Sequence, residues 1–173
     1  MKIRMLLAVL LVLCFAQMLV GQQSNPVWEK WQYLLGTWIG EGSGQPGQGS
    51  GSFTFQTDLS GSVIIRKSQT TFPATKDKGA SLHEDLLIIY LDYSGVPSKA
   101  IYFDNERHAI NYTVMYRDQV IVFTSESIKN APRFRLSYEP IDRNIVNTKF
   151  EIASPQNQDE FKTYIEGKSR RKE

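Results

Sequence analysis

The sequence predicts an all-β protein: a single antiparallel, up-and-down barrel of about ten strands, preceded by a short helix. Hydrophobic and polar residues alternate at period two through most of the chain after residue 36. Turn-forming residues interrupt this alternation at short intervals, and no helical pattern recurs between the alternating segments. Neighbouring strands are therefore expected to be antiparallel and joined by hairpins.

The chain begins with the order of features found in a secretory signal peptide. Lys2 and Arg4 precede an apolar run from Met5 to Phe15, and Gly21 lies in the polar segment that closes it. This run is shorter than the roughly 20 residues that a membrane-spanning helix needs. We expect residues 1–21 to be a signal peptide and residues 22–173 to form the barrel domain, which is exported to the periplasm or secreted. The alternative is an uncleaved membrane anchor, whereas cleavage leaves no stable anchor.

Charge and cysteine content narrow the possible partners of the exported domain. The chain has 20 basic and 18 acidic residues, and removal of Lys2 and Arg4 with the signal leaves 18 of each. A domain without net charge gives no reason to expect nucleic acid as a partner. The only cysteine, Cys14, lies in the signal, so the domain has neither a disulfide nor a thiolate metal site.

The expected elements follow one another without a linker, in one domain. Val27, Trp31 and Leu34 recur at helical spacing, and Gly36 ends this short helix. The strand candidates that follow are Thr37–Ser43, Ser50–Asp58, Ser62–Thr71, Glu84–Leu91, Ser98–Asp104, His108–Tyr116, Gln119–Ser125, Arg133–Glu139, Ile145–Ala153 and Phe161–Arg170. This number of strands fits a sandwich or a closed barrel, and the even hairpin spacing without long crossovers favours the barrel.

Few motifs in the chain indicate catalysis or cofactor binding. Gly42, Gly44 and Gly47 have the spacing of a dinucleotide fingerprint, but a strand follows them where a helix is required, so we interpret them as a hairpin loop. His83 and His108 lie near carboxylates and could bind a metal or move a proton, yet no metal-ligand spacing joins them. The alternative is that both histidines are ordinary polar residues at the barrel rim. The sequence therefore predicts no metal site and no catalytic residue.

Aromatic and polar residues share the predicted strands. A lumen that mixes tyrosine, histidine and arginine is typical of a ligand cavity rather than of a dry core. The candidate ligand-binding residues are Arg66, His83, Tyr102, His108 and Tyr112.

The segment from Trp31 to Gly42, which reads WQYLLGTWIGEG, resembles the start of the calycin superfamily barrels. It is most similar to nitrobindin-like proteins and to small bacterial lipocalin-like domains without a characterised function. Weaker matches to those domains lie at residues 49–55, 83–86 and 100–104. The resemblance implies that Trp38 packs in the barrel floor and that Arg170 or Arg171 lies across it. Such a cation–π contact contributes roughly 0.5–2 kcal/mol.

The resemblance also bears on cofactors. Nitrobindin-like barrels hold haem iron through a histidine near the C-terminus, whereas no histidine follows His108 in this chain. We therefore expect no cofactor, and haem would have to use His83 or His108. Three hypotheses remain: an exported barrel that binds a small, largely hydrophobic molecule in its lumen, a barrel enzyme or haem protein that uses one of these histidines, and a packed barrel without a ligand.

Overall fold

The computed structural model of the protein describes residues 26–41 and 49–173. The predicted signal peptide, the loop from Gly42 to Gly47 and the end of the first predicted strand at Ser43 lie outside the described residues. Within the described ranges, no helix has the length and apolar character needed to cross a membrane.

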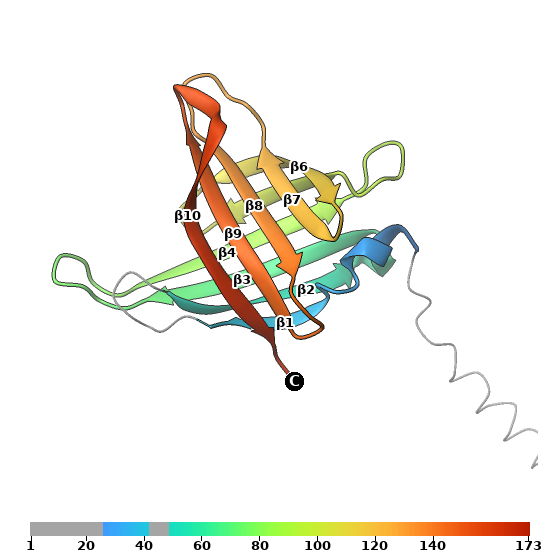
Figure 1. The fold of residues 1–173 in the computed structure, drawn as a ribbon, viewed down its shortest axis with the longest axis horizontal. Helices are drawn as coiled ribbons and strands as arrows, with labels where there is room; N and C mark the ends of the chain where they lie inside the picture. The colour runs from blue at the N-terminus through green and yellow to red at the C-terminus, as the bar shows by residue number, and fades with distance from the viewer. Residues whose placement is uncertain (1–25, 42–48) are drawn as a thin grey trace, which may run out of the picture.

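Ten antiparallel strands close into a barrel (Figure 1), so the predicted fold class is confirmed. In order around the barrel the strands are β1, β10, β9, β8, β7, β6, β5, β4, β3 and β2. Each strand after β1 thus lies beside its predecessor in the chain, and β10 closes the barrel against β1. Their bounds are β1 Gly36–Gly40, β2 Ser50–Asp58, β3 Val63–Phe72, β4 Ser81–Tyr90, β5 Lys99–Asp104, β6 Ala109–Arg117, β7 Val120–Ser125, β8 Arg133–Pro140, β9 Ile145–Ser154 and β10 Asn157–Arg171.

The predicted N-terminal helix is shorter than expected and is a 3-10 helix, η2, which spans Pro26–Trp31. Trp28 has non-helical backbone angles within it. The indole of Trp28 donates a hydrogen bond to the carbonyl of Gly61, and that of Trp31 donates to the hydroxyl of Tyr116. Both indoles are at most 1% exposed, so the segment is shaped by the burial of two large side chains rather than by a regular helical face. A second 3-10 turn, η3 (Leu59–Gly61), joins β2 to β3.

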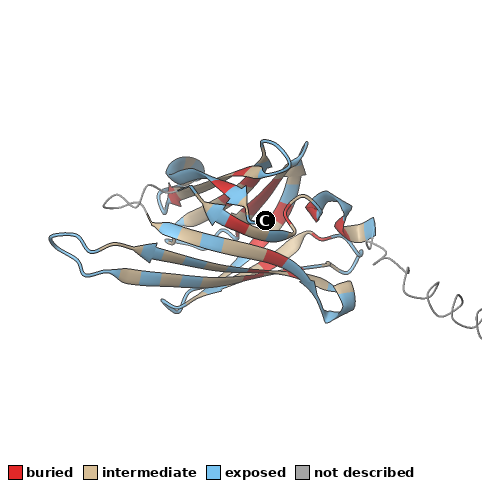
Figure 2. Ribbon diagram, turned by 90° about the horizontal axis from the view of Figure 1, so that it is seen from below, coloured by how far each residue is buried: buried red, intermediate tan, exposed pale blue. Residues whose placement is uncertain are grey.

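The two ends of the barrel differ. We call the end that carries η2 and η3 the closed end, and the end where β2 begins and β3 ends the open end, because the described inward-facing residues are less buried there. Inward-facing residues toward the closed end are buried: Trp38, Phe55, Ile64, Leu87, Ile89, Val114, Ile121, Phe123, Tyr138 and Val146. Inward-facing residues toward the open end are half-buried: Phe53, Ser68, Thr70, His83, Tyr102, Ile110, Phe134, Phe150 and Ile152. In Figure 2 the long hairpin that extends from the barrel is intermediate or exposed along its outer part, whereas buried residues lie nearer η2.

The cation–π contact expected at Trp38 is made by one of the two candidate arginines. The guanidinium carbon of Arg171 lies 4.3 Å from the centre of the Trp38 ring. Arg171 also donates hydrogen bonds of 2.6 Å to the carbonyls of Leu35 and Tyr33. Arg170 points outward instead, where it pairs with Glu41 at 2.8 Å. The arginine of β10 thus fixes the entry segment against the barrel at its closed end.

Candidate ligand-binding site

Arg66 is a buried charged residue on the inner face of β3. It lies between Phe55 and Leu87 in the ladders with β2 and β4. Its guanidinium pairs with Asp85 on β4 and donates a second hydrogen bond to the hydroxyl of Tyr138 on β8. Strands β3 and β8 are five positions apart in the closed order of ten, so the hydrogen bond to Tyr138 spans the barrel. Arg66 therefore crosses the lumen where full burial gives way to partial exposure.

The surroundings of Arg66 and Tyr138 keep the guanidinium charged and the phenol neutral. Burial lowers the pKa of Arg66, but the nearby Tyr138 and Asp85 outweigh that effect and leave its pKa above the ordinary value. Burial raises the pKa of the Tyr138 hydroxyl, so this group remains a neutral hydrogen-bonding partner. The side chains of Arg66 and Asp85 are each 7% exposed, which protects the ion pair from screening by salt.

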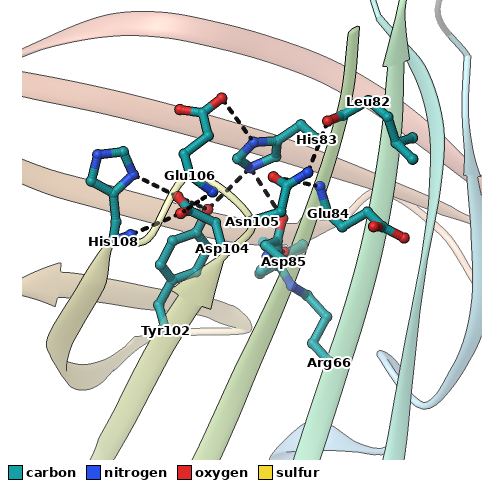
Figure 3. Close-up of polar contacts among 11 residues, drawn as sticks. Arg66, Leu82, His83, Glu84, Asp85, Tyr102, Asp104, Asn105, Glu106 and His108 are labelled. Atoms are coloured by element: carbon teal, nitrogen blue, oxygen red, sulfur yellow. Dashed lines mark hydrogen bonds and ion pairs between the residues drawn. The ribbon is translucent and has the colours of Figure 1, made fainter.

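His83 extends the polar network toward the open end (Figure 3). Its Nε2 atom lies 3.1 Å from the hydroxyl of Tyr102 and 3.8 Å from a carboxylate oxygen of Asp85. Its Nδ1 atom lies 3.6 Å from Glu106, which belongs to the turn between β5 and β6. The imidazole is partly exposed and joins the buried ion pair to the rim of the barrel.

Asp104 completes the network at the end of β5. Its carboxylate accepts hydrogen bonds from the Tyr102 hydroxyl and from the backbone amides of Glu106 and His108. It also lies 2.7 Å from His108 Nδ1. Burial raises the pKa of Asp104, but the hydrogen bonds from His108 and Glu106 outweigh it and lower the pKa below the ordinary value. Burial, reinforced by Asp85 and Asp104, raises the pKa of Tyr102, so its hydroxyl stays protonated.

The structure brings four of the five predicted ligand-binding residues into this single network: Arg66, His83, Tyr102 and His108. Tyr112 lies deeper in the lumen, where its ring meets that of Phe123 at 6.2 Å. His108 is the least enclosed of the four, because its side chain is 59% exposed at the rim. His108 therefore borders the site through Asp104 rather than lining the lumen.

Two polar atoms at the same level have no hydrogen-bond partner within the described part of the chain. They are Arg66 Nε and Thr148 Oγ1, and both atoms are buried. Thr148 is the cross-strand partner of Tyr138, the residue to which Arg66 donates. The orphaned atoms therefore lie around the same tyrosine. A buried donor without a partner costs about 1–3 kcal/mol, so both atoms favour a further polar group in the lumen.

The wall opposite the histidines is apolar and not filled. Phe134 and Phe150 stack with ring centres 5.9 Å apart, and Ile165, which pairs with Phe150, is 52% exposed. Gly167 pairs with Thr148 in the ladder and so faces the same side of the sheet. A side chain begun at Gly167 would meet no atom within 4 Å among the described residues. The open half thus combines a polar wall on β3–β5 with an apolar wall on β8–β10, where the described residues leave room beside Gly167.

An open depression of about 420 Å³ lies elsewhere, over β4–β6. It is lined by Tyr90, Leu91, Asp92, Tyr93, Lys99, Asn111, Tyr112 and Glu126. Apart from Tyr112 this lining shares no residue with the predicted site. Tyr90 and Lys99 face outward, since they alternate with the buried Ile89 and Ala100, so this hollow lies on the outer face of the barrel, although the lumen residue Tyr112 also borders it.

Asp85, Tyr138 and Thr148 were not predicted as site residues. The alternation in β4 carries a usable signal, because it places Asp85 on the same face as the apolar Leu87 and Ile89. A carboxylate on a buried face requires a charged or hydrogen-bonding partner. No comparable signal marks Tyr138, which lies 72 residues from Arg66 in the chain.

No group of three or more His, Cys, Asp or Glu side chains among residues 26–41 and 49–173 is placed to hold a metal ion. Both ring nitrogens of His83 already face polar partners, so iron ligation by this residue would require the imidazole to leave them. Neither a protein-family model nor a curated protein matches this chain.

Proposed function

We propose that this protein is an exported, calycin-like binding protein that holds a small, largely hydrophobic molecule in the open half of its barrel. The proposal is carried by the change in burial along the lumen. Inward-facing residues are fully buried toward η2 but half-buried toward the open end. A barrel that served only as a packed scaffold would gain stability by filling this half as well.

The chemistry of the open half supports the same function. Aromatic and aliphatic side chains such as Phe134 and Phe150 offer contact area to an apolar molecule. A few convergent polar groups, Arg66, His83 and Tyr102, face them from the other wall. Predominantly apolar lining with a small number of placed polar groups is the usual composition of a small-molecule site.

Export rests on the N-terminal sequence. The basic, apolar and polar segments of residues 1–21 follow the order of a secretory signal. N-terminal sequencing of the protein recovered from the periplasm or the medium of an exporting host tests this part. A chain that retains Met1 and fractionates with membranes would refute cleavage and favour the uncleaved anchor.

Binding is tested first by native mass spectrometry of the exported protein, together with its absorption spectrum. We expect a mass above that of the bare chain, and the excess should be released on denaturation. A Soret band would support the haem alternative instead. N-phenyl-1-naphthylamine, an uncharged apolar dye, then tests whether the purified protein can bind an apolar molecule. The mass of the bare chain together with failure to bind this dye would favour the packed barrel without a ligand.

The location of the site is tested by filling the space beside Gly167. The Gly167→Leu variant should lower dye affinity by at least about tenfold, because Gly167 faces the lumen and a Cβ there meets no atom of the described residues within 4 Å. The Lys168→Leu variant adds the same side chain to the outward-facing neighbour on β10 and should bind the dye as the native protein does. Equal affinities for the two variants would place the dye outside the lumen.

A further inference from the structure

The polar wall of the open half holds more negative than positive charge. The three enclosed charged side chains there are Arg66, Asp85 and Asp104, of which the two carboxylates are 7% and 3% exposed. Arg66 neutralises Asp85, and Asp104 is paired with an imidazole and backbone amides. With neutral imidazoles, Arg66, Asp85 and Asp104 together carry a net charge of −1. An anion entering the lumen would meet uncompensated negative charge in a poorly screened environment.

The two orphaned atoms specify a complementary group on the ligand. Arg66 Nε can only donate a hydrogen bond, whereas the Thr148 hydroxyl can donate or accept. Arg66 donates to the Tyr138 hydroxyl and Thr148 is the cross-strand partner of Tyr138, so both unpartnered atoms belong to neighbours of this tyrosine. A hydroxyl or carbonyl oxygen fulfils this role without adding negative charge.

We propose that the ligand carries an uncharged hydroxyl or carbonyl oxygen at its inner end, and that carboxylate-terminated molecules are disfavoured. This oxygen accepts a hydrogen bond from Arg66 Nε and forms another with the Thr148 hydroxyl. The apolar body extends toward Phe134 and Phe150 at the open end. This inference rests on the proposed function, since it specifies the ligand class of the same lumen.

The test compares 1-decanol with decanoate as competitors of N-phenyl-1-naphthylamine at pH 8, where a free carboxyl group is ionised. These competitors share the same chain length and differ only in the oxygen-bearing end. We expect decanol to compete at least about tenfold more tightly. Tighter competition by decanoate would overturn the inference and leave the proposed function standing. Failure of the dye itself to bind would overturn the proposed function, and the inference with it.

A preference for alcohol could also reflect only the cost of removing a carboxylate from water, and variants separate the two causes. Asp85→Asn removes one negative charge beside Arg66, so the ratio of decanol to decanoate affinity should fall by at least about tenfold. A ratio equal to that of the native protein would overturn the charge argument. Asp104→Asn serves the same purpose if Asp85→Asn does not fold.

Thr148→Val tests the hydrogen bond independently, because it keeps the shape of the side chain and removes only the orphaned hydroxyl. Decanol affinity should fall by about threefold to tenfold, whereas the affinity of the dye, which lacks an oxygen, should not change. A decanol affinity that matches the native protein would show that the ligand oxygen lies elsewhere. Equal losses for decanol and for the dye would also overturn the assignment, since they would indicate altered packing alone.

Discussion

The buried pair formed by Arg66 and Asp85 supplies a quantitative test of the lumen's electrostatics. Arg66→Met leaves the Asp85 carboxylate buried and removes the donor to Tyr138, so we expect a loss of about 3–5 kcal/mol in the free energy of unfolding. Asp85→Leu leaves the Arg66 guanidinium buried without a counter-ion and should lower the free energy of unfolding by a similar amount. The double variant replaces both charges by apolar groups and should cost no more than about 2 kcal/mol, because such replacements are often near neutral. The coupling energy is then at least about 4 kcal/mol.

Urea unfolding at pH 7, followed by tryptophan fluorescence, measures these free energies. Trp28, Trp31 and Trp38 are all buried at the closed end, so their emission reports the unfolding of the barrel rather than events at the rim. Additive costs in the double variant would refute the reasoning, because they would mean that the two side chains do not depend on each other. Single-variant costs below about 1 kcal/mol would likewise indicate a solvated pair.

Further predictions concern the barrel wall and its charges. Gly51→Ala places a methyl group 2.3 Å from a backbone carbonyl of β3 and should lower the free energy of unfolding by about 1–3 kcal/mol, whereas Gly79→Ala, whose methyl group meets no described atom within 4 Å, should not. Arg171→Met should cost about 2–4 kcal/mol through its three carbonyl hydrogen bonds and its ring contact, whereas Arg170→Met should cost less than about 1 kcal/mol. The hydrogen bond from its β8 arginine partner lowers the pKa of Glu151, so its stabilisation is present above the unfolded pKa of about 4.3 and is lost as pH falls through the folded pKa. Urea midpoints at pH 6 and pH 3 should therefore differ less in Glu151→Gln than in the native protein.

The fold was predictable because alternation and turn residues agree along most of the chain. The predicted bounds of β2 match the structure, since Phe53 and Phe55 alternate with polar residues between two clear turns. The start of β4 was missed because residues 81–83 are largely polar, and their strand conformation comes from pairing with β3 rather than from their own burial. The polar start of β10 was missed for the same reason, since residues 157–160 are joined to β9 across a register shift.

The candidate site was predictable only in part, because sequence identifies residue types but not which distant strands meet. His83 and Tyr102 were predicted from their position among aromatic residues, and the hairpin register of β4 and β5 brings them within hydrogen-bonding distance. Tyr138 lies across the barrel from Arg66, so its role depends on closure of the barrel and not on any local pattern. The orphaned hydroxyl of Thr148 was hidden for the same reason.

Stability and binding can be separated in this barrel, because they depend on different halves. The closed half is held by three buried tryptophans, among which Trp31 meets Phe55 and Phe123 at 6.5 and 5.9 Å. The ion pair at the boundary is a weak source of stability, since an apolar pair of similar volume would serve the fold about as well. Its presence is better explained by the ligand that it selects. The double variant of Arg66 and Asp85 should therefore lose no more than about 2 kcal/mol of stability yet bind decanol about threefold to tenfold more weakly, because it lacks the Arg66 Nε donor. A native decanol affinity in that stable variant would mean that Arg66 does not bind the ligand oxygen.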